Sequence, residues 1–279
     1  AAVAQSRTAH DRFLAKLPAG VQLFAMFHTH PELLDVVAEI MGGAPKLADQ
    51  LSRRPDRLEA MLNDDYRGPP PSLEELIAEC DSDVRRGAFF EDKLDIARRW
   101  AGDRRFLIGL QILRGQMKPV DSGPALSHIA EAVLRAMLAA VRQELEIHHG
   151  TVPGGRVMLL AMGKLASKEL MPGSDLDLIL IYDAPEDCTG SDGAKPLAVS
   201  AYYSRLCQRL VNALTALTAE GMLYEIDLRL RPSGNKGPLA CSLTAFDSYH
   251  RKDAWTWEHM ALSRARAVAG DTDLCETVD

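Results

Sequence analysis

The sequence predicts an α+β protein, in which an all-helical module over residues 1–150 precedes a smaller module of strands and helices over residues 151–279. From residue 7 to residue 149, apolar residues recur at three- and four-residue steps, which is the period of one helix face. After residue 150 the apolar residues form short runs bounded by glycine, proline and polar residues, as is typical of strands. A helical pattern separates two of these runs, so strands and helices share the second module.

The helical module is expected to contain one long amphipathic helix and several short ones. Ser72 and Glu75 form a capping box, which marks a helix start after a stiff proline-rich linker. Thr29 and Glu32 form a similar box, and Pro55 begins another short helix. The long helix ends near Gly150, and its apolar face is formed by Leu126, Ile129, Val133, Met137, Val141 and Leu145.

The second module is expected to contain three strands and two helices. The strands are predicted over residues 157–162, 175–182 and 224–230. One helix lies between the second and third strands, and Thr244 caps the last helix, on which Glu258 is expected to orient an arginine. The expected core contacts are Leu206, Leu210, Leu214 and Leu217 in the first of these helices, and Phe246, Trp257 and Ala261 in the last.

The composition is that of a globular protein in a reducing cytoplasm. The chain has 279 residues, of which 47% are hydrophobic, and its net charge of −7 disfavours a nucleic-acid partner. Five cysteines without C-x-x-C spacing indicate neither a disulfide framework nor a zinc site. We see no signal peptide and no apolar run near the roughly 20 residues of a membrane span, so no membrane partner is expected. The first residue is not Met, and the chain reads as a segment of a longer one.

Two stretches combine acidic residues with apolar runs: GSDLDLILIYD at residues 173–183, and YEIDLRLRPSG at residues 224–234. In a strand, residues two apart project to the same side, so Asp175 and Asp177 share a face. These carboxylates repel each other and resist desolvation unless a cation neutralises them. The second stretch alternates apolar residues with charged ones, namely Glu225, Asp227, Arg229 and Arg231.

A third carboxylate beside the first two would complete a metal site. Asp175, Asp177 and Asp227 together suit one or two Mg²⁺ ions, because Mg²⁺ takes oxygen ligands and shares them with substrate phosphates. This pattern favours phosphoryl or nucleotidyl transfer. The residues alone leave open the alternative that Asp227 only pairs with Arg229 or Arg231 on a solvated sheet face.

Neighbouring residues suit phosphate. Gly173 and Ser174 supply a turn that allows close backbone approach and a hydroxyl group. Arg229 and Arg231 supply forked cations. Lys164 follows the first strand, where phosphate contact and simple solvation are equally consistent with the pattern.

Three blocks of the sequence resemble the signature blocks of glutamine-synthetase adenylyltransferase, the bifunctional family that attaches AMP to glutamine synthetase and removes it. The blocks read AMGKLASKELMPGSDLDLILIYD, YEIDLRLRPSGNKGPLACS and AWTWEHMALSRARAVAGD. The resemblance is strongest over residues 158–271, and it departs from the usual glycine at Ala166. It implies a polymerase-beta-like nucleotidyltransferase domain with a small mixed sheet over residues 151–279.

The resemblance also implies roles and partners. Asp175, Asp177 and Asp227 would be the catalytic and metal-binding carboxylates. The GSDLDL and AWTWEHMALSRAR strings resemble the C-terminal, AMP-adding half of the family, whereas the removing half has an SSDID-like pattern and lacks WTW. Gly173 and Ser174 would lie against the nucleotide phosphates. The implied partners are glutamine synthetase as protein substrate and, on the full-length enzyme, a nitrogen-signalling regulatory protein.

The implied reaction transfers AMP from ATP to a tyrosine hydroxyl of glutamine synthetase and releases pyrophosphate. Mg²⁺, or Mn²⁺ in its place, would join ATP to the carboxylates. Asp227 or the metal would help to remove the tyrosine proton, and Arg229 or Arg231 would steady the leaving group. Three alternatives remain: phosphorolytic removal of AMP, a catalytically silent nucleotide-binding module, and polynucleotide extension, which the acidic charge disfavours.

Overall fold

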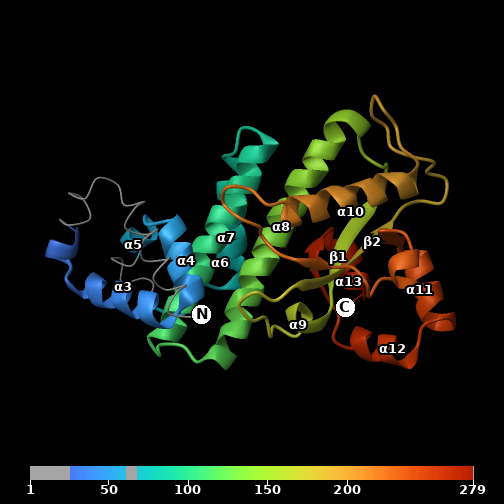
Figure 1. The fold of residues 1–279 in the computed structure, drawn as a ribbon. Helices are drawn as coiled ribbons and strands as arrows, with labels where there is room; N and C mark the ends of the chain where they lie inside the picture. The colour runs from blue at the N-terminus through green and yellow to red at the C-terminus, as the bar shows by residue number, and fades with distance from the viewer. Residues whose placement is uncertain (1–25, 61–67, 279) are drawn as a thin grey trace. The chain divides into compact units, whose positions relative to one another are not determined.

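A computed structural model describes residues 26–60 and 68–278 of the chain (Figure 1). The chain forms two compact units. The first takes in the residues up to Pro71 together with Asp103–Ala125, and the second takes in Ser72–Gly102 and Leu126–Asp279. Two long helices, α7 (Phe90–Leu113) and α8 (Ser122–His149), therefore contribute residues to both units.

The boundary predicted at residue 150 marks a change of secondary structure. Before it, the described residues form helices and no strand, as expected. Packing divides the chain elsewhere, because α6 (Leu73–Arg85) and most of α8 belong to the same unit as the sheet.

The first unit is helical in the part that the structure describes. Its apolar core includes Ile40, Leu51 and Phe106, each at most 1% exposed. The capping box predicted at Thr29 and Glu32 is wrong: Pro31 itself adopts helical angles and precedes the helix without a side-chain cap. The elements are α3 (Glu32–Gly43), α4 (Pro45–Arg53), α5 (Arg57–Ala60) and the 3-10 helix η2 (Pro119–Asp121).

The helices of the second unit begin with a confirmed capping box. The Ser72 hydroxyl accepts from the Glu75 backbone N–H at 3.3 Å, and the Glu75 carboxylate accepts from the Ser72 N–H at 2.8 Å. The remaining helices are α9 (Gly163–Ala166), α10 (Val199–Thr215), α11 (Leu243–Lys252), α12 (Thr256–Leu262), α13 (Thr272–Val278) and the 3-10 helix η3 (Gly234–Lys236).

Helix α8 is a core helix. The predicted apolar face is confirmed, because all six of its residues from Leu126 to Leu145 are buried. Among the described residues, Pro119–His149 is the one helix long and apolar enough to cross a membrane, but 78% of its most apolar stretch is buried inside the structure. The helix reaches this length with polar and charged residues among the apolar ones, and burial in the protein core explains the apolar residues.

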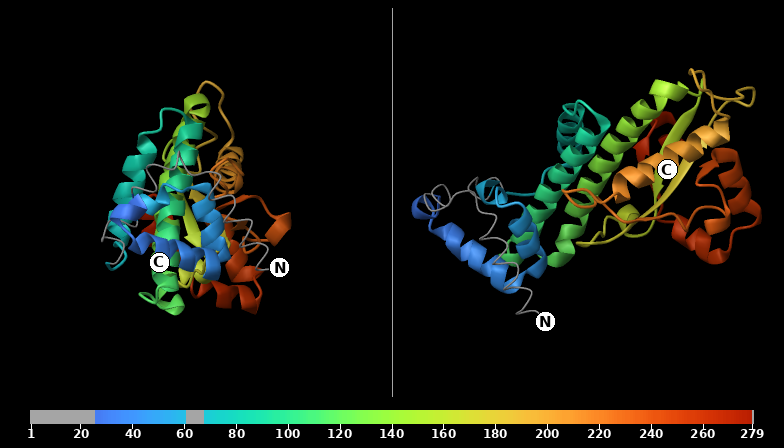
Figure 2. Two further views of the ribbon diagram at one scale, coloured as in Figure 1. Left: turned by 60° about the vertical axis from the view of Figure 1, so that its left-hand side comes forward. Right: turned by 45° about the horizontal axis from the view of Figure 1, so that its top comes forward.

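The sheet of the second unit is mixed and has β2 near its centre (Figure 2). Strand β2 pairs with β1 antiparallel on one side, and β1 pairs with β5 antiparallel in turn. On its other side β2 pairs in parallel with β3 at its beginning and with β4 at its end. The strands are β1 (Arg156–Ala161), β2 (Leu176–Asp183), β3 (Ile226–Asp227), β4 (Ala240–Ser242) and β5 (Arg266–Gly270).

Side chains alternate between the two faces of the sheet along β1 and β2, and the apolar core lies against one of these faces. Met158 and Leu160 of β1 lie in one buried cluster with Ile179 of β2, as residues two apart must share a face. Phe246 of α11 and Leu274 of α13 complete this cluster from the helices. The predicted core role of Phe246 is thus confirmed.

Several predicted elements differ in the structure. Helix α10 ends at Thr215, so Leu217 lies beyond it and is 82% exposed instead of buried. The last predicted helix is two helices, and Ser242, not Thr244, caps the first of them. Strands β4 and β5 were not predicted, because short strands depend on pairing with distant partners more than on their own residues.

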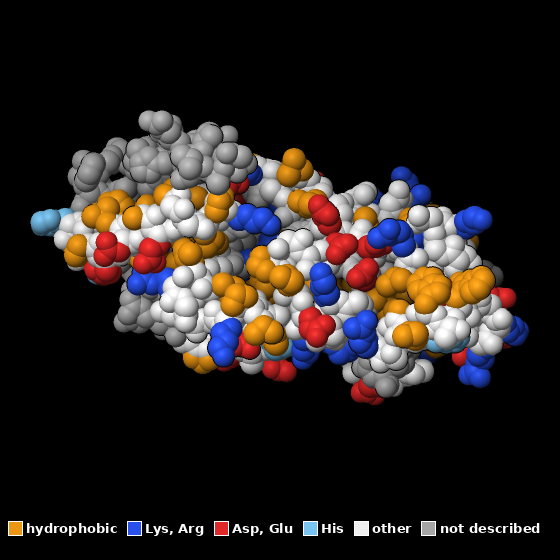
Figure 3. Space-filling view, turned by 60° about the horizontal axis from the view of Figure 1, so that its bottom comes forward, with side chains coloured by type: hydrophobic (Ala, Val, Ile, Leu, Met, Phe, Trp, Pro, Cys, Tyr) orange, Lys and Arg blue, Asp and Glu red, His pale blue; other side chains and the backbone are white. Residues whose placement is uncertain are grey.

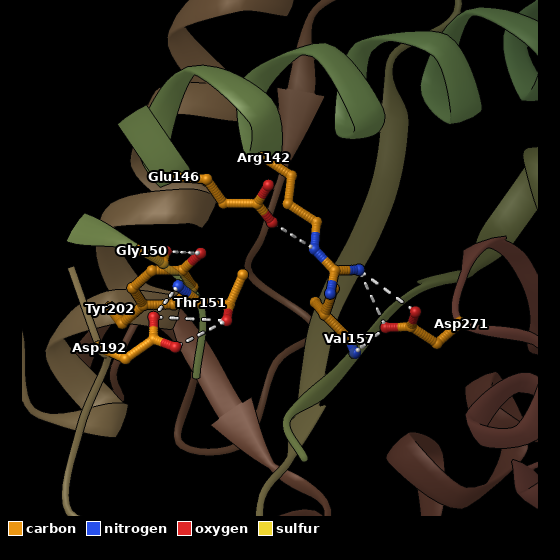
Figure 4. Close-up of polar contacts among 8 residues, drawn as sticks. All are labelled: Arg142, Glu146, Gly150, Thr151, Val157, Asp192, Tyr202 and Asp271. Atoms are coloured by element: carbon orange, nitrogen blue, oxygen red, sulfur yellow. Dashed lines mark hydrogen bonds and ion pairs between the residues drawn. The ribbon is translucent and has the colours of Figure 1, made fainter. Parts of the chain in front are cut away.

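A polar network fastens α8 to the sheet (Figure 4). Arg142 of α8 donates to the carboxylate of Asp271, which follows β5, at 3.2 Å, and to Glu146 at 3.1 Å. Asp271 also accepts the backbone N–H of Val157 in β1 at 2.8 Å. One carboxylate therefore joins α8, β1 and the end of β5.

Candidate active site

The beginning of β2 brings the predicted carboxylates together. Asp175 is exposed directly before the strand, and Asp177 is half-buried as its second residue. The parallel pairing of β2 with β3 sets Asp177 opposite Asp227 in the register. The sequence predicted this meeting of Asp227 with the other two, and the strand pairing confirms it for Asp177.

The three carboxylates influence one another electrostatically. Burial raises the pKa of Asp177 above its usual value, and the negative charges of Asp175 and Asp227 raise it further. The cations of Arg229 and Lys164 act in the opposite direction on the same group. The three carboxylates and these two cations therefore form one electrostatic cluster.

Asp227 is held by Arg229. Its carboxylate accepts the backbone N–H of Arg229 at 2.8 Å and the Nε–H at 2.7 Å, and Arg229 Nη2 forms a further short ion pair with it. The hydrogen bonds from Arg229 lower the pKa of Asp227. The same backbone bond turns the chain after Asp227 and ends β3 there, which explains why the strand predicted to Leu230 stops early.

The residues that follow β1 lie next to Asp177. The backbone N–H of Met162 donates to the carbonyl oxygen of Asp177 at 2.9 Å. Gly163 follows with a φ of +53°, and a Cβ at this position would overlap the carboxylate of Asp177. Lys164 is exposed on the short helix α9. Sequence reasoning missed Gly163, although a glycine between a buried strand and a lysine was the available signal.

The turn before β2 forms as predicted. Gly173 has a φ of +85°, and the backbone N–H of Ser174 donates to the carbonyl of Met171 at 2.9 Å. The Ser174 hydroxyl oxygen accepts the Met171 N–H at 3.1 Å and so closes the turn. A phosphate contact by Gly173 or Ser174 stays a prediction.

Arg231 does not join the charged face, which corrects the predicted alternation of this segment. The chain turns at residues 229–230, and the Arg231 side chain is 7% exposed. Its guanidinium donates to the carbonyl oxygens of Leu228 at 2.7 Å and Pro238 at 3.0 Å. Arg231 therefore stabilises the loop after β3, whereas Arg229 remains beside the carboxylates.

The donor set suits a divalent cation in its chemistry, but it is not gathered as a ligand cluster. Among the residues that the structure describes, no group of three or more histidine, cysteine, aspartate or glutamate side chains is arranged to hold a metal ion. Burial and the neighbouring negative charges both raise the pKa of Asp177, and a cation would relieve the repulsion among these charges. Arg229 now supplies positive charge to Asp227, so metal binding by all three carboxylates requires Arg229 to move.

Helix α12 presents apolar side chains to solvent. Figure 3 shows a row of hydrophobic side chains on the C-terminal part of the chain, with acidic and basic ones beside it. Trp255, Trp257 and Met260 are 70%, 54% and 69% exposed, so the prediction of Trp257 as a core residue is wrong. The predicted arginine partner of Glu258 is wrong as well, because its buried carboxylate accepts from Tyr249 Oη at 3.0 Å and from the Trp255 N–H at 2.8 Å.

Comparison with known proteins assigns the chain to a family of adenylyltransferases. The family described as glutamate-ammonia ligase adenylyltransferase matches residues 34–279, and the chain belongs to this family. The resemblance stated from the sequence blocks is thereby confirmed.

Similar proteins carry the name bifunctional glutamine synthetase adenylyltransferase/adenylyl-removing enzyme. The one from Mesorhizobium japonicum is 50% identical over 269 residues, which are 96% of this chain and 27% of that protein. The one from Agrobacterium fabrum is 47% identical over 266 residues, 95% of this chain and 27% of that protein. The chain thus spans about a quarter of the length of these relatives.

Proposed function

We propose that this chain transfers AMP from ATP to a tyrosine hydroxyl of glutamine synthetase and releases pyrophosphate. The observation that carries the proposal is the parallel pairing of β2 and β3, which sets Asp177 opposite Asp227 with Asp175 close by. The names of the relatives supply the protein substrate. Modification of this substrate would regulate nitrogen assimilation in the cytoplasm, with a nitrogen-signalling protein acting on the longer enzyme.

Asp175, Asp177 and Asp227 would hold Mg²⁺ or Mn²⁺. The metal would neutralise charge on the phosphates and polarise the α-phosphate of ATP. While Arg229 holds Asp227, this carboxylate is a poor proton acceptor, because the hydrogen bonds from Arg229 lower its pKa. The low pKa therefore disfavours the proposed role of Asp227 as a general base more than its role as a metal ligand.

Two cationic side chains beside the carboxylates would bind the triphosphate of ATP. Arg229 is 73% exposed on its side chain and so is accessible to a ligand. Its planar fork matches phosphate oxygens as well as it matches the carboxylate of Asp227. Lys164 is exposed on α9, its positive charge acts on Asp177, and it would bind phosphate as a point charge. The turn at Gly173 and Ser174 would contribute backbone N–H groups.

The relatives' printed name favours a second reaction, which is phosphorolytic removal of AMP from modified glutamine synthetase. Removal uses the same carboxylates and differs in the acceptor, which is inorganic phosphate. The GSDLDL and AWTWEHM strings favour AMP addition for this chain.

The two reactions separate in a direct assay. The chain is incubated with ATP, Mg²⁺ and unmodified glutamine synthetase, or with phosphate, Mg²⁺ and AMP-modified glutamine synthetase, and the intact mass of the target is measured. We expect AMP addition in the first mixture and no loss in the second. Loss of AMP in the second mixture alone would replace addition by removal.

Substitutions test whether AMP transfer requires the carboxylates. Asp177→Asn should abolish transfer, because the amide removes a charge from the cluster. Asp183→Asn is the matched control: Asp183 ends the same strand and pairs with Arg156 at 2.5 Å, on the opposite end from the cluster. Equal transfer by the two variants would defeat the assignment, and tight ATP binding with no transfer by the unsubstituted chain would indicate a silent nucleotide-binding module.

A further inference from the structure

An ion pair with a buried carboxylate lies close to the candidate site. Glu131 of α8 has no exposed surface. Its two carboxylate oxygens accept from Arg266 of β5, with Nη1–Oε2 at 2.8 Å and Nη2–Oε1 at 2.5 Å. A bidentate pair of this kind fixes the plane of the guanidinium as well as its position.

The same guanidinium reaches the end of α9. Arg266 Nη2 lies 3.3 Å from the carbonyl oxygen of Leu165, and Nε lies 3.4 Å from that of Ala166. Leu165 and Ala166 are the last residues of α9, where helix carbonyls lack partners within the helix and attract positive charge. Arg266 therefore joins α8, β5 and α9.

The other end of α9 touches the carboxylates. Gly163 leaves no room for a Cβ beside the Asp177 carboxylate, and the positive charge of Lys164 acts on that carboxylate. A helix of four residues has almost no stability of its own. Its position beside β2 therefore depends on contacts with the rest of the unit: the burial of Leu165, the close approach to Asp177 at one end and the hydrogen bonds from Arg266 at the other.

We propose that Glu131 and Arg266 are positioning residues, which hold α9 so that Gly163 and Lys164 keep their places beside Asp177. The expectation about reaction rate rests on the proposed function. The position of α9 can be measured without it.

Stability alone does not require such a pair. Replacing both members of a buried ion pair by apolar residues of similar volume is often neutral or stabilising, whereas removing one member leaves an uncompensated charge. A double variant can therefore restore stability without restoring the two donors to α9. Arg142 and Asp271 offer a control, because they also join α8 to the β5 end of the sheet but donate nothing to α9 in the contacts described.

The first measurement is backbone hydrogen exchange in the whole 279-residue chain. The amides of Ser167 and Glu169 report on α9, since they donate to the carbonyls of Gly163 and Lys164 at 3.2 and 2.8 Å. In Glu131→Leu/Arg266→Met, we expect residues 162–170 to exchange at least severalfold faster while β1 keeps its protection. Arg142→Lys should leave exchange of this segment unchanged.

The second measurement is AMP transfer at saturating ATP. We expect the double variant to keep the melting temperature within a few degrees and to lose about tenfold to a hundredfold in kcat, the loss typical of a misplaced group near the reacting atoms. KM for glutamine synthetase should stay unchanged. If the double variant fails to fold, the same measurements are made on Arg266→Lys, because lysine keeps the positive charge but lacks the planar guanidinium with its several donors.

The proposal is overturned if the double variant, or Arg266→Lys in its place, keeps both the original protection of α9 and the original kcat. A fall in melting temperature with unchanged α9 exchange would likewise assign the pair a purely structural role. Absence of AMP transfer in the unsubstituted chain would defeat the proposed function instead, and the exchange measurement would then decide the positioning role alone.

Discussion

Replacement of Gly163 by alanine is a sharp test of the close contact between α9 and the carboxylates. Gly163 has a φ of +53°, which lies in the left-handed region and costs an L-residue about 1–2 kcal/mol. The new methyl group would also overlap the carboxylate of Asp177, so the side chain or α9 must move. Two effects are therefore expected, one on stability and one on activity.

Gly115→Ala separates these effects. Gly115 has a φ of +67°, but a Cβ there meets no atom within 4 Å. Both variants should lose about 1–2 kcal/mol of stability from backbone strain, as measured by urea denaturation. Only Gly163→Ala should lose AMP transfer, by up to about a hundredfold, because a displacement near 1 Å at a reacting group has effects of that size.

The rate comparison decides the matter. Transfer is measured at saturating ATP by the mass shift of glutamine synthetase, with enzyme concentration corrected for the folded fraction. If Gly163→Ala transfers AMP as fast as Gly115→Ala, the close approach of α9 to Asp177 has no catalytic importance.

Three further substitutions test the charges in and beside the site. The pKa of Asp177 is raised above 3.8, so the folded state binds this proton more tightly than the unfolded state, and its ionisation costs stability as pH rises from about 3.8 through the folded pKa. Asp177→Asn should therefore raise the melting temperature at pH 7, with a gain that shrinks in acid and is absent below the unfolded pKa; a gain that persists there contradicts the sign. Arg231→Met should cost about 1.5–3 kcal/mol in urea denaturation, because two part-buried carbonyl oxygens lose a charged donor, whereas Arg229→Met should change stability little and AMP transfer strongly. Equal unfolding midpoints for the two arginine variants would contradict their assignment to different environments.

Local sequence patterns were sufficient where one element carried the whole signal. The apolar face of α8 could be predicted because its six residues recur at helical spacing along a single helix. The Ser72–Glu75 capping box needs only two residues three apart, and it forms as expected. The strand repeat of two residues predicted a shared face for Asp175 and Asp177, and the structure has Asp177 in β2 with Asp175 directly before it.

Patterns failed where a side chain had competing partners. Arg231 alternates with apolar residues like a surface strand residue, yet it is buried once the chain turns, where it donates to the carbonyls of Leu228 and Pro238, three and seven residues away. Trp257 is hydrophobic enough for a core, but its short helix buries Glu258 through Tyr249 and leaves the tryptophan outside. Neither outcome has a signal in the local spacing.

The order of residues along the chain was enough to indicate strands, helices, an acidic pair and membership of an enzyme family, since all of these depend on short-range repeats and contiguous blocks. Only the folded chain decides which distant groups meet. Asp227 reaches Asp177 through the pairing of two strands, and Arg266 reaches Glu131 across 135 positions of sequence. The physical reason is that strand pairing and buried ion pairs are chosen by the packing of the whole unit, whereas periodicity reports on a single element at a time.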